Sequence, residues 1–381
     1  MKKKLLLLCS YVMVAALATM LTLGLTGHSE EPSKLEQLET LIQQRFIGEA
    51  DSEELEDAAA NAMVTATGDR WSYYIPAKSY EAYEEQMTNA YVGVGITIQT
   101  QEDDSGFLIL SVTPGGPAEE AGLKVNDLLI LVGDQDVRGM SSEEVRDLVK
   151  GEQGTSVNLT VLRTGETVTV PVERRKVETA VAAYQMLEGK TGLVTIANFD
   201  ERCAQETIAA IEALRDQGAE KLIFDVRNNP GGYADELVKV LDYLLPEGEV
   251  FHTVDYSGKE NVDYSDENCL ELPMAVLVNG NSYSAAEFFA AALQENEAAV
   301  VVGEKTVGKG YFQTTFHLND GSAVSLSIGE YFTPKGKNLA GVGVTPDKIV
   351  TVDEETAAEI YYDMIPPEED PQIQAALKEL K

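Results

Sequence analysis

Histidine is scarce in this chain, with three residues among 381: His28, His252 and His317. A hydrolase built on a Ser-His-Asp triad needs a histidine base beside its nucleophile. No serine of the GxSxG or GDSGG type accompanies these histidines. Such a triad is therefore poorly supported, and a reaction that uses His252 or His317 remains an alternative to be tested.

Cysteine is just as rare, and its three residues are Cys9, Cys203 and Cys269. The chain has no CxxC pair, and the HExxH, EF-hand, GxxxxGK[ST] and GxGxxG patterns are also missing. These absences exclude the common sequence signatures of zinc, calcium and nucleotide-phosphate sites. We therefore expect neither a metal nor a cofactor. The sequence leaves open whether Cys203 and Cys269 form a disulfide.

Basic residues are outnumbered, since 29 Lys and Arg stand against 64 Asp and Glu, for a formal net charge of −35. A field of this sign repels phosphate backbones, so we expect no nucleic acid among the partners. The hydrophobic content of 44% and the charged content of 24% are those of a globular protein. A chain of this length is expected to hold two or three domains.

The long hydrophobic run of the chain lies at the N-terminus. Lys2, Lys3 and Lys4 precede the uncharged stretch 5–26, and a helix needs about 20 residues to cross a bilayer. Lysines before such a helix stay in the cytoplasm, so the rest of the chain is expected outside. We expect an uncleaved, single-pass anchor in a bacterial cell membrane. The alternative is a signal peptide that is cleaved after export.

Composition and periodicity divide the chain into five parts. Residues 1–27 form the anchor or signal segment, and residues 28–90 carry leucine spacings of three and four that predict helices. Residues 91–175 form a β-rich module, residues 176–350 an α/β domain, and residues 351–381 a helical tail. The end of the tail has the spacing of an amphipathic helix, which makes a homodimer one further expectation.

In the β-rich module, the alternation of Val92, Val94, Ile96 and Ile98 predicts one strand. Further strands are expected at 107–112, 128–132, 157–162 and 167–172, and short helices at 118–121 and 142–149.

Apolar strands alternate with helices from residue 191 onward, which predicts an α/β layer around a mostly parallel sheet. The strands are expected at 192–196, 221–226, 274–278 and 299–302, and the helices at 204–215, 234–244 and 285–293. In such folds the loops that follow the strands carry the functional site.

The loop after the strand 221–226 ends in Pro230, Gly231 and Gly232. Glycines let backbone N–H groups face an incoming oxygen, and the helix just beyond adds the positive end of its dipole. Gly231 or Gly232 could therefore donate to an oxyanion. A simple strand-to-helix turn is the alternative.

The loop after the strand 274–278 ends at Ser284, beside the start of the next helix. Ser284 is either a helix cap, with Glu287 completing a capping box, or a nucleophile. In the second case the Ala285 N–H would point at the developing oxyanion, and the serine would need a base.

The loop after the strand 299–302 supplies a candidate base, because Lys309 lies there between Gly308 and Gly310. An amine works as a general base when desolvation lowers its pKa towards neutrality. Gln313 follows four residues later and could orient the amine. The alternative is a solvated turn lysine.

Together these loops resemble the motifs of the carboxyl-terminal processing proteases, also called tail-specific proteases. The motif D-L-R-x-N-P-G-G is matched at 225–232, S-A-S-A-S-E at 282–287 and G-E-K-T-x-G-K-G-x-x-Q at 303–313. A fourth signature, which runs from Y-x-T-P to G-V-x-P-D, is matched at 331–347. The resemblance implies a ClpP- or crotonase-like α/β catalytic core with an inserted PDZ domain and a helical N-terminal segment.

The resemblance also assigns roles to single residues. It implies that Ser284 is the nucleophile, Lys309 the base and Gln313 the residue that supports the base. Two positions of the serine motif differ from the family pattern, because Tyr283 and Ala286 replace small residues of that pattern.

The β-rich module resembles the PDZ domain of the same family. PDZ domains bind a terminal carboxylate at a glycine-containing loop while the peptide adds as a strand to the sheet edge. The residues at the corresponding place are Val92, Gly93, Val94, Gly95 and Ile96.

The resemblance thus implies an exported serine endopeptidase that cleaves proteins whose apolar C-termini are captured by the PDZ domain. Lys309 would take the proton of Ser284, and water would release the acyl-enzyme. The alternative is a catalytically inactive PDZ scaffold of the cell envelope.

Overall fold

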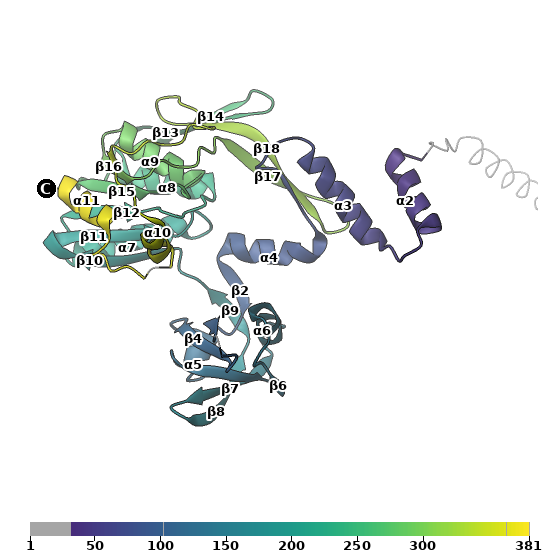
Figure 1. Cartoon of the computed structure of the whole chain (residues 1–381). Coiled ribbons are helices and arrows are strands. Elements are labelled where there is room, and N and C mark those ends of the chain that lie inside the picture. The colour runs from purple at the N-terminus through teal and green to yellow at the C-terminus, as the bar shows by residue number, and fades with distance from the viewer. Residues whose placement is uncertain (1–31, 102, 363, 381) are drawn as a thin grey trace, which may run out of the picture. The chain divides into compact units, whose positions relative to one another are not determined.

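The computed structural model describes residues 32–101, 103–362 and 364–380, and the chain forms two compact units, Met1–Arg70 and Trp71–Lys381 (Figure 1). No described helix is long and apolar enough to span a membrane. The predicted anchor precedes the described residues, as do Cys9 and His28, so the structure does not test it.

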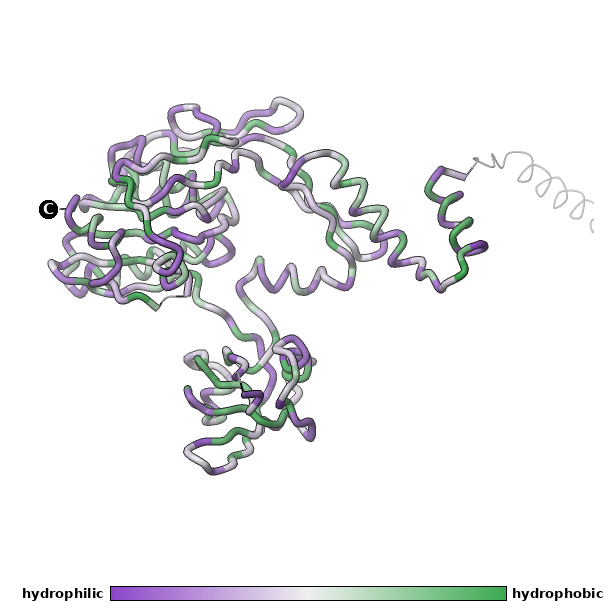
Figure 2. The backbone as a smooth tube through the Cα atoms, viewed as in Figure 1, coloured by the Kyte–Doolittle hydropathy of each residue, from purple (hydrophilic) through white to green (hydrophobic). Residues whose placement is uncertain are grey.

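The first unit contains two helices, α2 (Lys34–Arg45) and α3 (Ser52–Thr65). Ser33 and Glu36 form a capping box at the start of α2, and the Asp51 side chain caps α3. Hydrophobic residues are visible on both helices in Figure 2. In the part of this unit that the structure describes, neither helix contains a buried residue.

The second unit is built around a six-stranded sheet. In spatial order its strands are β10 (Ala182–Leu187), β11 (Thr191–Ile196), β12 (Lys221–Asp225), β15 (Met274–Val278), β16 (Ala299–Gly303) and β19 (Lys348–Ile349). Every neighbouring pair is parallel except β10 with β11, which a short 3-10 helix at Glu188–Lys190 connects. The predicted mostly parallel sheet is confirmed.

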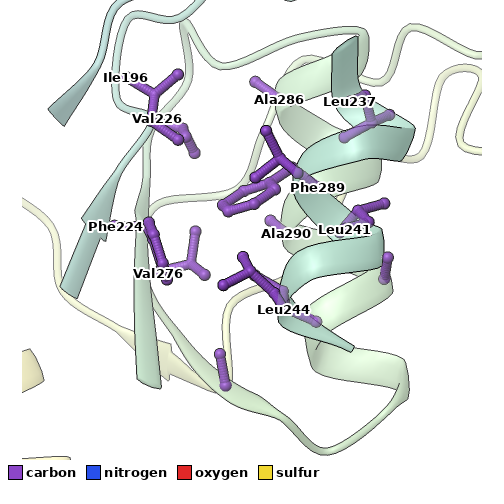
Figure 3. Close-up of a cluster of buried hydrophobic side chains, with 14 of the residues drawn as sticks. Ile196, Phe224, Val226, Leu237, Leu241, Leu244, Val276, Ala286, Phe289 and Ala290 are labelled. Atoms are coloured by element: carbon purple, nitrogen blue, oxygen red, sulfur yellow. The ribbon is translucent and has the colours of Figure 1, made fainter. Parts of the chain in front are cut away.

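Three helices cover one face of this sheet: α7 (Cys203–Asp216), α8 (Ala234–Leu244) and α9 (Ala285–Glu295). Side chains at alternate strand positions point to this face, and Figure 3 shows Phe224 opposite Phe289. Phe289 packs edge-on against Phe224, with ring centres 5.5 Å apart. This core fixes where the strands end and the helices begin.

The C-terminal helix α11 (Pro371–Glu379) covers the opposite face of the sheet. Ile373 and Ala376 are buried there against Ile223 and Leu277, which alternate with the residues of the first face. The apolar side of α11 is therefore used within the chain, and it does not support the dimer that its spacing suggested.

A second, antiparallel sheet was not predicted. Its strands are β1 (Tyr73–Ile75), β18 (Ala323–Phe332), β13 (Gly248–Asp255) and β14 (Glu260–Ser265), with β17 (Tyr311–His317) also paired to β18. These strands mix polar, aromatic and small residues, so their sequence lacks the apolar runs of the parallel sheet.

The elements of the β-rich module match the prediction from residue 107 onward, except that the short strand at 135–136 was not predicted. They are β3 (Ile96–Thr100), β4 (Phe107–Val112), α5 (Pro117–Glu120), β5 (Leu128–Val132), β6 (Gln135–Asp136), α6 (Ser142–Val149), β7 (Ser156–Arg163) and β8 (Glu166–Glu173). Its buried side chains form a core of their own. Helix α4 (Ala77–Thr88) precedes this module, and α10 (Glu354–Tyr361) precedes α11.

The single strand predicted from Val92 to Ile98 is wrong, because two strands occupy this stretch. β2 (Ala90–Gly93) pairs with β9 (Arg175–Glu178) where the chain enters and leaves the module, and β3 starts at Ile96. Between them Gly95 has φ 78°, a left-handed conformation that breaks an extended strand.

The two cysteines in the described residues, Cys203 and Cys269, are free thiols, which answers the open question of a disulfide. Cys203 is fully buried at the start of α7. Burial raises the pKa of its thiol to about 12, so Cys203 is a packing residue rather than a nucleophile.

Candidate active site

The three predicted loops meet because their strands are neighbours. β12, β15 and β16 are adjacent and parallel, so their carboxyl ends lie at one edge of the sheet. We call this the carboxyl edge. It comprises residues 198–200 after β11, 226–232 after β12, 279–284 after β15 and 304–310 after β16.

Ser284 occupies a strained turn at the start of α9. Its φ of 59° and ψ of −129° lie outside the regions that non-glycine residues ordinarily populate. An ordinary N-cap is extended instead. Such strain persists only where the surroundings impose it, and it clusters at catalytic sites. The conformation favours a nucleophile over a simple cap.

Gly231 packs directly against the nucleophile. A Cβ at this position would lie 2.6 Å from Ser284 Cβ and 2.9 Å from the Ala285 nitrogen. The Gly231 N–H already donates to Asn229 Oδ1 at 2.8 Å. The N–H groups of Gly232 and Ala285 are therefore better candidates for oxyanion donors, which narrows the prediction made from sequence.

Buried polar side chains fix the spacing between the loop after β12 and the loop after β15. Asn229 is fully buried, and its Nδ2 donates to the carbonyl of Ile196 at 2.8 Å. The Tyr283 N–H donates to the Asn229 carbonyl at 3.1 Å. The Ser282 hydroxyl donates to the Val226 carbonyl at 2.6 Å. Sequence reasoning assigned no role to these asparagine and serine residues.

Glu287 joins the nucleophile to the lysine loop. Its carboxylate is fully buried and accepts from the Ser284 N–H at 3.1 Å, the Gly308 N–H at 2.7 Å and the Lys309 N–H at 2.8 Å. The Thr306 hydroxyl also donates to it. Burial raises the pKa of Glu287, while these hydrogen bonds oppose the rise. Sequence reasoning found the capping bond to Ser284 but not the bonds to the lysine loop.

Lys309 is half-buried and lies beside two aromatic rings. Its Nζ is 4.9 Å from the centre of the Trp71 ring and 5.9 Å from that of Tyr283. The two rings stack on one another, with centres 5.7 Å apart and planes inclined by 29°. Sequence reasoning gave Trp71 no role, and Tyr283 entered only as a departure from the family motif.

Gln313 lies at a β-bulge in the pairing of β17 with β18. Its amide nitrogen donates to the Tyr311 carbonyl at 3.1 Å and to the Ser327 hydroxyl at 2.9 Å. These bonds hold the amide in place. Its orienting action on Lys309 stays a prediction.

Arg227 connects the oxyanion-donor loop to the C-terminal helix. Its guanidinium binds Asp225 and lies 2.8 Å from Asp370 Oδ2, and it donates to Gln372 Oε1 at 2.9 Å. Burial opposes its charge, but Asp225 and Asp370 outweigh this effect and raise the Arg227 pKa. Asp370 also caps α11, and it lies outside every motif, so nothing in the sequence indicated this contact.

His252 and His317 belong to the antiparallel sheet instead. The His252 ring packs on Phe332 at 5.3 Å between centres, and His317 packs on Tyr80 at 5.0 Å. Neither lies in the loops of the carboxyl edge, so the structure gives no support to a histidine triad.

Two of the predicted carboxylate-binding residues, Val92 and Gly93, pair with β9 as part of β2. The other three, Val94, Gly95 and Ile96, lead into the sheet edge formed by β3. β3 is the terminal strand of its sheet, and α6 lies beside it, with Thr100 Oγ1 3.1 Å from Ser142 Oγ. The carbonyls of Val94 and Gly95 accept hydrogen bonds from within the module. An open edge strand beside a helix is the arrangement that β-strand addition of a peptide requires.

Comparison with known proteins decides the family. The chain is 31% identical over 361 residues to the carboxy-terminal processing protease CtpA of Bacillus subtilis (strain 168). The match covers 91% of this chain and 77% of that protein. The chain belongs to peptidase family S41. The model of this family matches residues 190–350, and a PDZ domain model matches residues 108–163.

A second relative agrees with this assignment to family S41. A probable CtpA-like serine protease of Staphylococcus saprophyticus is 31% identical over 354 residues, which is 90% of this chain and 72% of that protein. A putative S41 protease from Bacteroides fragilis has the same fold, with a TM-score of 0.56 at 16% identity over 90% of this chain and 96% of that one. This S41 chain is thus a serine-type peptidase of the carboxyl-terminal processing kind, with an α/β catalytic core and a PDZ domain.

Proposed function

We propose that this S41 peptidase is a membrane-anchored endopeptidase that acts outside the cytoplasm through a Ser284–Lys309 dyad. One observation carries the proposed dyad: the buried Glu287 carboxylate binds the backbone of the strained Ser284 turn and the backbone of Lys309 at once. A carboxylate in this position holds a nucleophile and a base in fixed register.

The proposed reaction follows from this geometry. Lys309 Nζ takes the proton of Ser284 Oγ, which attacks the scissile carbonyl. The N–H groups of Gly232 and Ala285 stabilise the tetrahedral oxyanion. Lys309 then gives the proton to the leaving amine, and a water activated by Lys309 hydrolyses the acyl-enzyme. The reaction needs no metal and no nucleotide.

The PDZ domain is proposed to bind the apolar C-terminus of a protein substrate along β3, near Gly95. Binding there would gate the catalytic domain through the strands that connect the two domains. Asn89 and Asn198 exchange side-chain hydrogen bonds of 3.1 and 2.7 Å at this junction, and the Arg202 guanidinium donates to the Thr179 carbonyl at 2.7 Å. Asn198 belongs to the carboxyl edge, so a movement of the connecting strands has a physical route to the site.

The location in the cell rests on the sequence of residues 2–26, a lysine-flanked apolar stretch. A fusion of the first residues to a reporter that is active only outside the cytoplasm tests this part of the proposal. Activity of the reporter in the membrane fraction is expected, and a reporter found in the medium would indicate a cleaved signal peptide instead.

The dyad is tested with the full-length chain in mild detergent and an unfolded protein substrate that ends in apolar residues. Ser284→Ala and Lys309→Ala should each lower kcat by at least about a thousandfold, because neither partner acts alone. Lys305→Ala is the matched control, since Lys305 is an exposed lysine of the same loop. It should retain wild-type activity.

Two outcomes would reject the proposal. If wild type and both variants cleave equally little while the chain still binds the apolar tail, the inactive scaffold is correct. If replacing His252 and His317 abolishes cleavage and Lys309→Ala does not, a histidine-dependent mechanism is correct.

A further inference from the structure

Two aromatic rings from distant parts of the chain lie beside the Lys309 ammonium. Trp71 precedes strand β1, and Tyr283 precedes Ser284. The Lys309 Nζ lies within 6 Å of both ring centres, at 4.9 and 5.9 Å. This is the range in which the negative face of an aromatic ring attracts a cation, and tryptophan attracts most strongly.

The rings are themselves held in place. Trp71 and Tyr283 stack at 5.7 Å, so each limits the movement of the other. Ser72, which follows Trp71, accepts a hydrogen bond from the Ser327 N–H at 2.9 Å, and β1 then pairs with β18. The Tyr283 N–H is bound to the Asn229 carbonyl. Both rings are therefore anchored to the framework that also positions the nucleophile.

We propose that Trp71 and Tyr283 are positioning residues that hold the charged amine of Lys309 beside Ser284 between catalytic cycles. The inference rests on the proposed function, because it takes Lys309 as the general base. Neither aromatic residue would touch the scissile bond through this role, since both act through the lysine.

The charged and titratable groups around Lys309 are consistent with this role. Burial raises the Tyr283 pKa above its usual value of 10, so its ring stays neutral where a protease works. Glu287 faces the Lys309 backbone N–H. Asp69 and Arg70 precede Trp71 in the sequence. Both residues are unchanged in every variant and labelled protein described below.

Fluorinated tryptophan separates the electronic effect of the Trp71 ring from the effect of its size. This labelling is specific because Trp71 is the only tryptophan of the chain. Growth on mono-, di- and trifluorotryptophan changes this ring alone, and each fluorine withdraws electron density from its face at nearly constant shape. Weaker attraction between the Trp71 ring and the Lys309 amine destabilises the charged form of Lys309. The acid limb of the kcat/KM profile should move to lower pH with each fluorine, by about half a pH unit in total.

KM should not change across the fluorine series. An acid limb that stays fixed, in a protein whose Lys309→Ala variant is inactive, would overturn the inference while leaving the dyad intact. A rise in KM with an unmoved limb would overturn it as well, because Trp71 would then contact the substrate. If Lys309→Ala retains activity, the proposed function fails.

A second measurement does not depend on catalysis. In the Ser284→Ala background, the fluorescence of Trp71 should change in one pH step as the amine beside it loses its proton. The step should disappear in Lys309→Met, and it should remain in Lys305→Met and in Tyr283→Phe. A step that survives Lys309→Met would show that the indole senses another group and would overturn the inference.

Discussion

The carboxyl edge and the PDZ edge strand both use glycine to bring a backbone close to a peptide, but they are built in opposite ways. At the carboxyl edge Gly231 touches Ser284, and buried side chains such as Asn229 and Glu287 bond nearly every loop to another. At the PDZ edge Gly95 lies before a terminal strand whose outer side is open to a partner.

This difference reflects what each site has to do. Chemistry requires donors and a nucleophile at fixed positions before the substrate arrives, so the loops are locked to one another. Capture of a tail requires unpaired backbone groups at a sheet edge, because the peptide itself completes the sheet. The same substitution should therefore have unequal effects at the two glycines.

Gly231→Ala should lower peptidase activity more than Gly95→Ala does. The new Cβ would lie 2.6 Å from Ser284 Cβ at a φ of 93°, so the nucleophile and the Ala285 N–H must both move. We expect kcat to fall by about a hundredfold or more, as for loss of an oxyanion donor. Steady-state kinetics on a short peptide without a PDZ-binding tail measures this directly.

The control for Gly231→Ala is Gly258→Ala. Gly258 has a comparable φ of 81° but nothing within 4 Å of an added Cβ. It carries the same backbone strain without the clash. Wild-type kcat in Gly258→Ala is expected, and equal losses in both variants would show that strain rather than contact with Ser284 is the cause.

Gly95→Ala should give a smaller effect of a different kind. The added Cβ would lie 3.2 Å from the Thr113 side chain at a φ of 78°, which strains the loop without displacing the catalytic residues. We expect KM for a substrate with an apolar tail to rise about five- to tenfold, since strain in this region costs about 1 kcal/mol.

Cleavage of the tailless peptide should stay unchanged in Gly95→Ala. A loss of kcat on that peptide would contradict the separation between capture and chemistry. Direct binding of a fluorescent tail peptide to the Ser284→Ala variant, with and without Gly95→Ala, gives the same comparison without turnover.

The parallel sheet and the catalytic loops were predictable from sequence because their signals are local. Apolar runs such as Met274–Val278 end at glycine-containing loops, and adjacent parallel strands bring such loops to one edge. Helix α8 was predicted with its observed ends, Ala234 and Leu244. The serine and lysine motifs then identified two of the residues in those loops.

The remaining features depend on contacts between distant segments. Trp71 reaches Lys309 from a segment that precedes the PDZ domain, and Asp370 reaches Arg227 from the C-terminal helix. No periodicity or motif in their own neighbourhoods encodes these contacts. The split of β2 from β3 was missed for another reason, since alternating Val92 to Ile98 fits one strand unless the φ of Gly95 is known.

Two buried aspartates extend the comparison to electrostatics. In the PDZ domain, Asp127 is buried, but Arg163 binds it at 2.7 Å and the Lys124 N–H at 2.8 Å. Burial favours the neutral acid, yet these bonds prevail and lower its pKa. At the carboxyl edge, Asp200 Oδ1 is buried with no hydrogen-bond partner among the described residues. Burial, with a smaller contribution from Glu201, raises the Asp200 pKa to about 7.

The two aspartates should therefore change stability with pH in opposite directions. Folded Asp200 holds its proton up to about pH 7, whereas the unfolded residue has the ordinary aspartate pKa of 3.8. Its contribution to stability is full below pH 3.8 and is lost as the pH rises to about 7. The contribution of Asp127 is present above its unfolded pKa and is lost as the pH falls through its lower folded pKa.

Thermal melting of wild type, Asp200→Asn and Asp127→Asn at pH 4 and pH 7 tests this contrast. The fall in Tm from pH 4 to pH 7 should be smaller in Asp200→Asn than in wild type by about 3 °C or more. Asp127→Asn should be less stable than wild type at both pH values, because the contribution of Asp127 is lost only below its unfolded pKa of 3.8. The three proteins differ from one another by at most one charge, so the change in net charge between pH 4 and pH 7 affects them almost equally. Parallel curves for wild type and Asp200→Asn would mean that the Asp200 carboxyl meets water, and the carboxyl edge would then be less closed than its hydrogen bonds indicate.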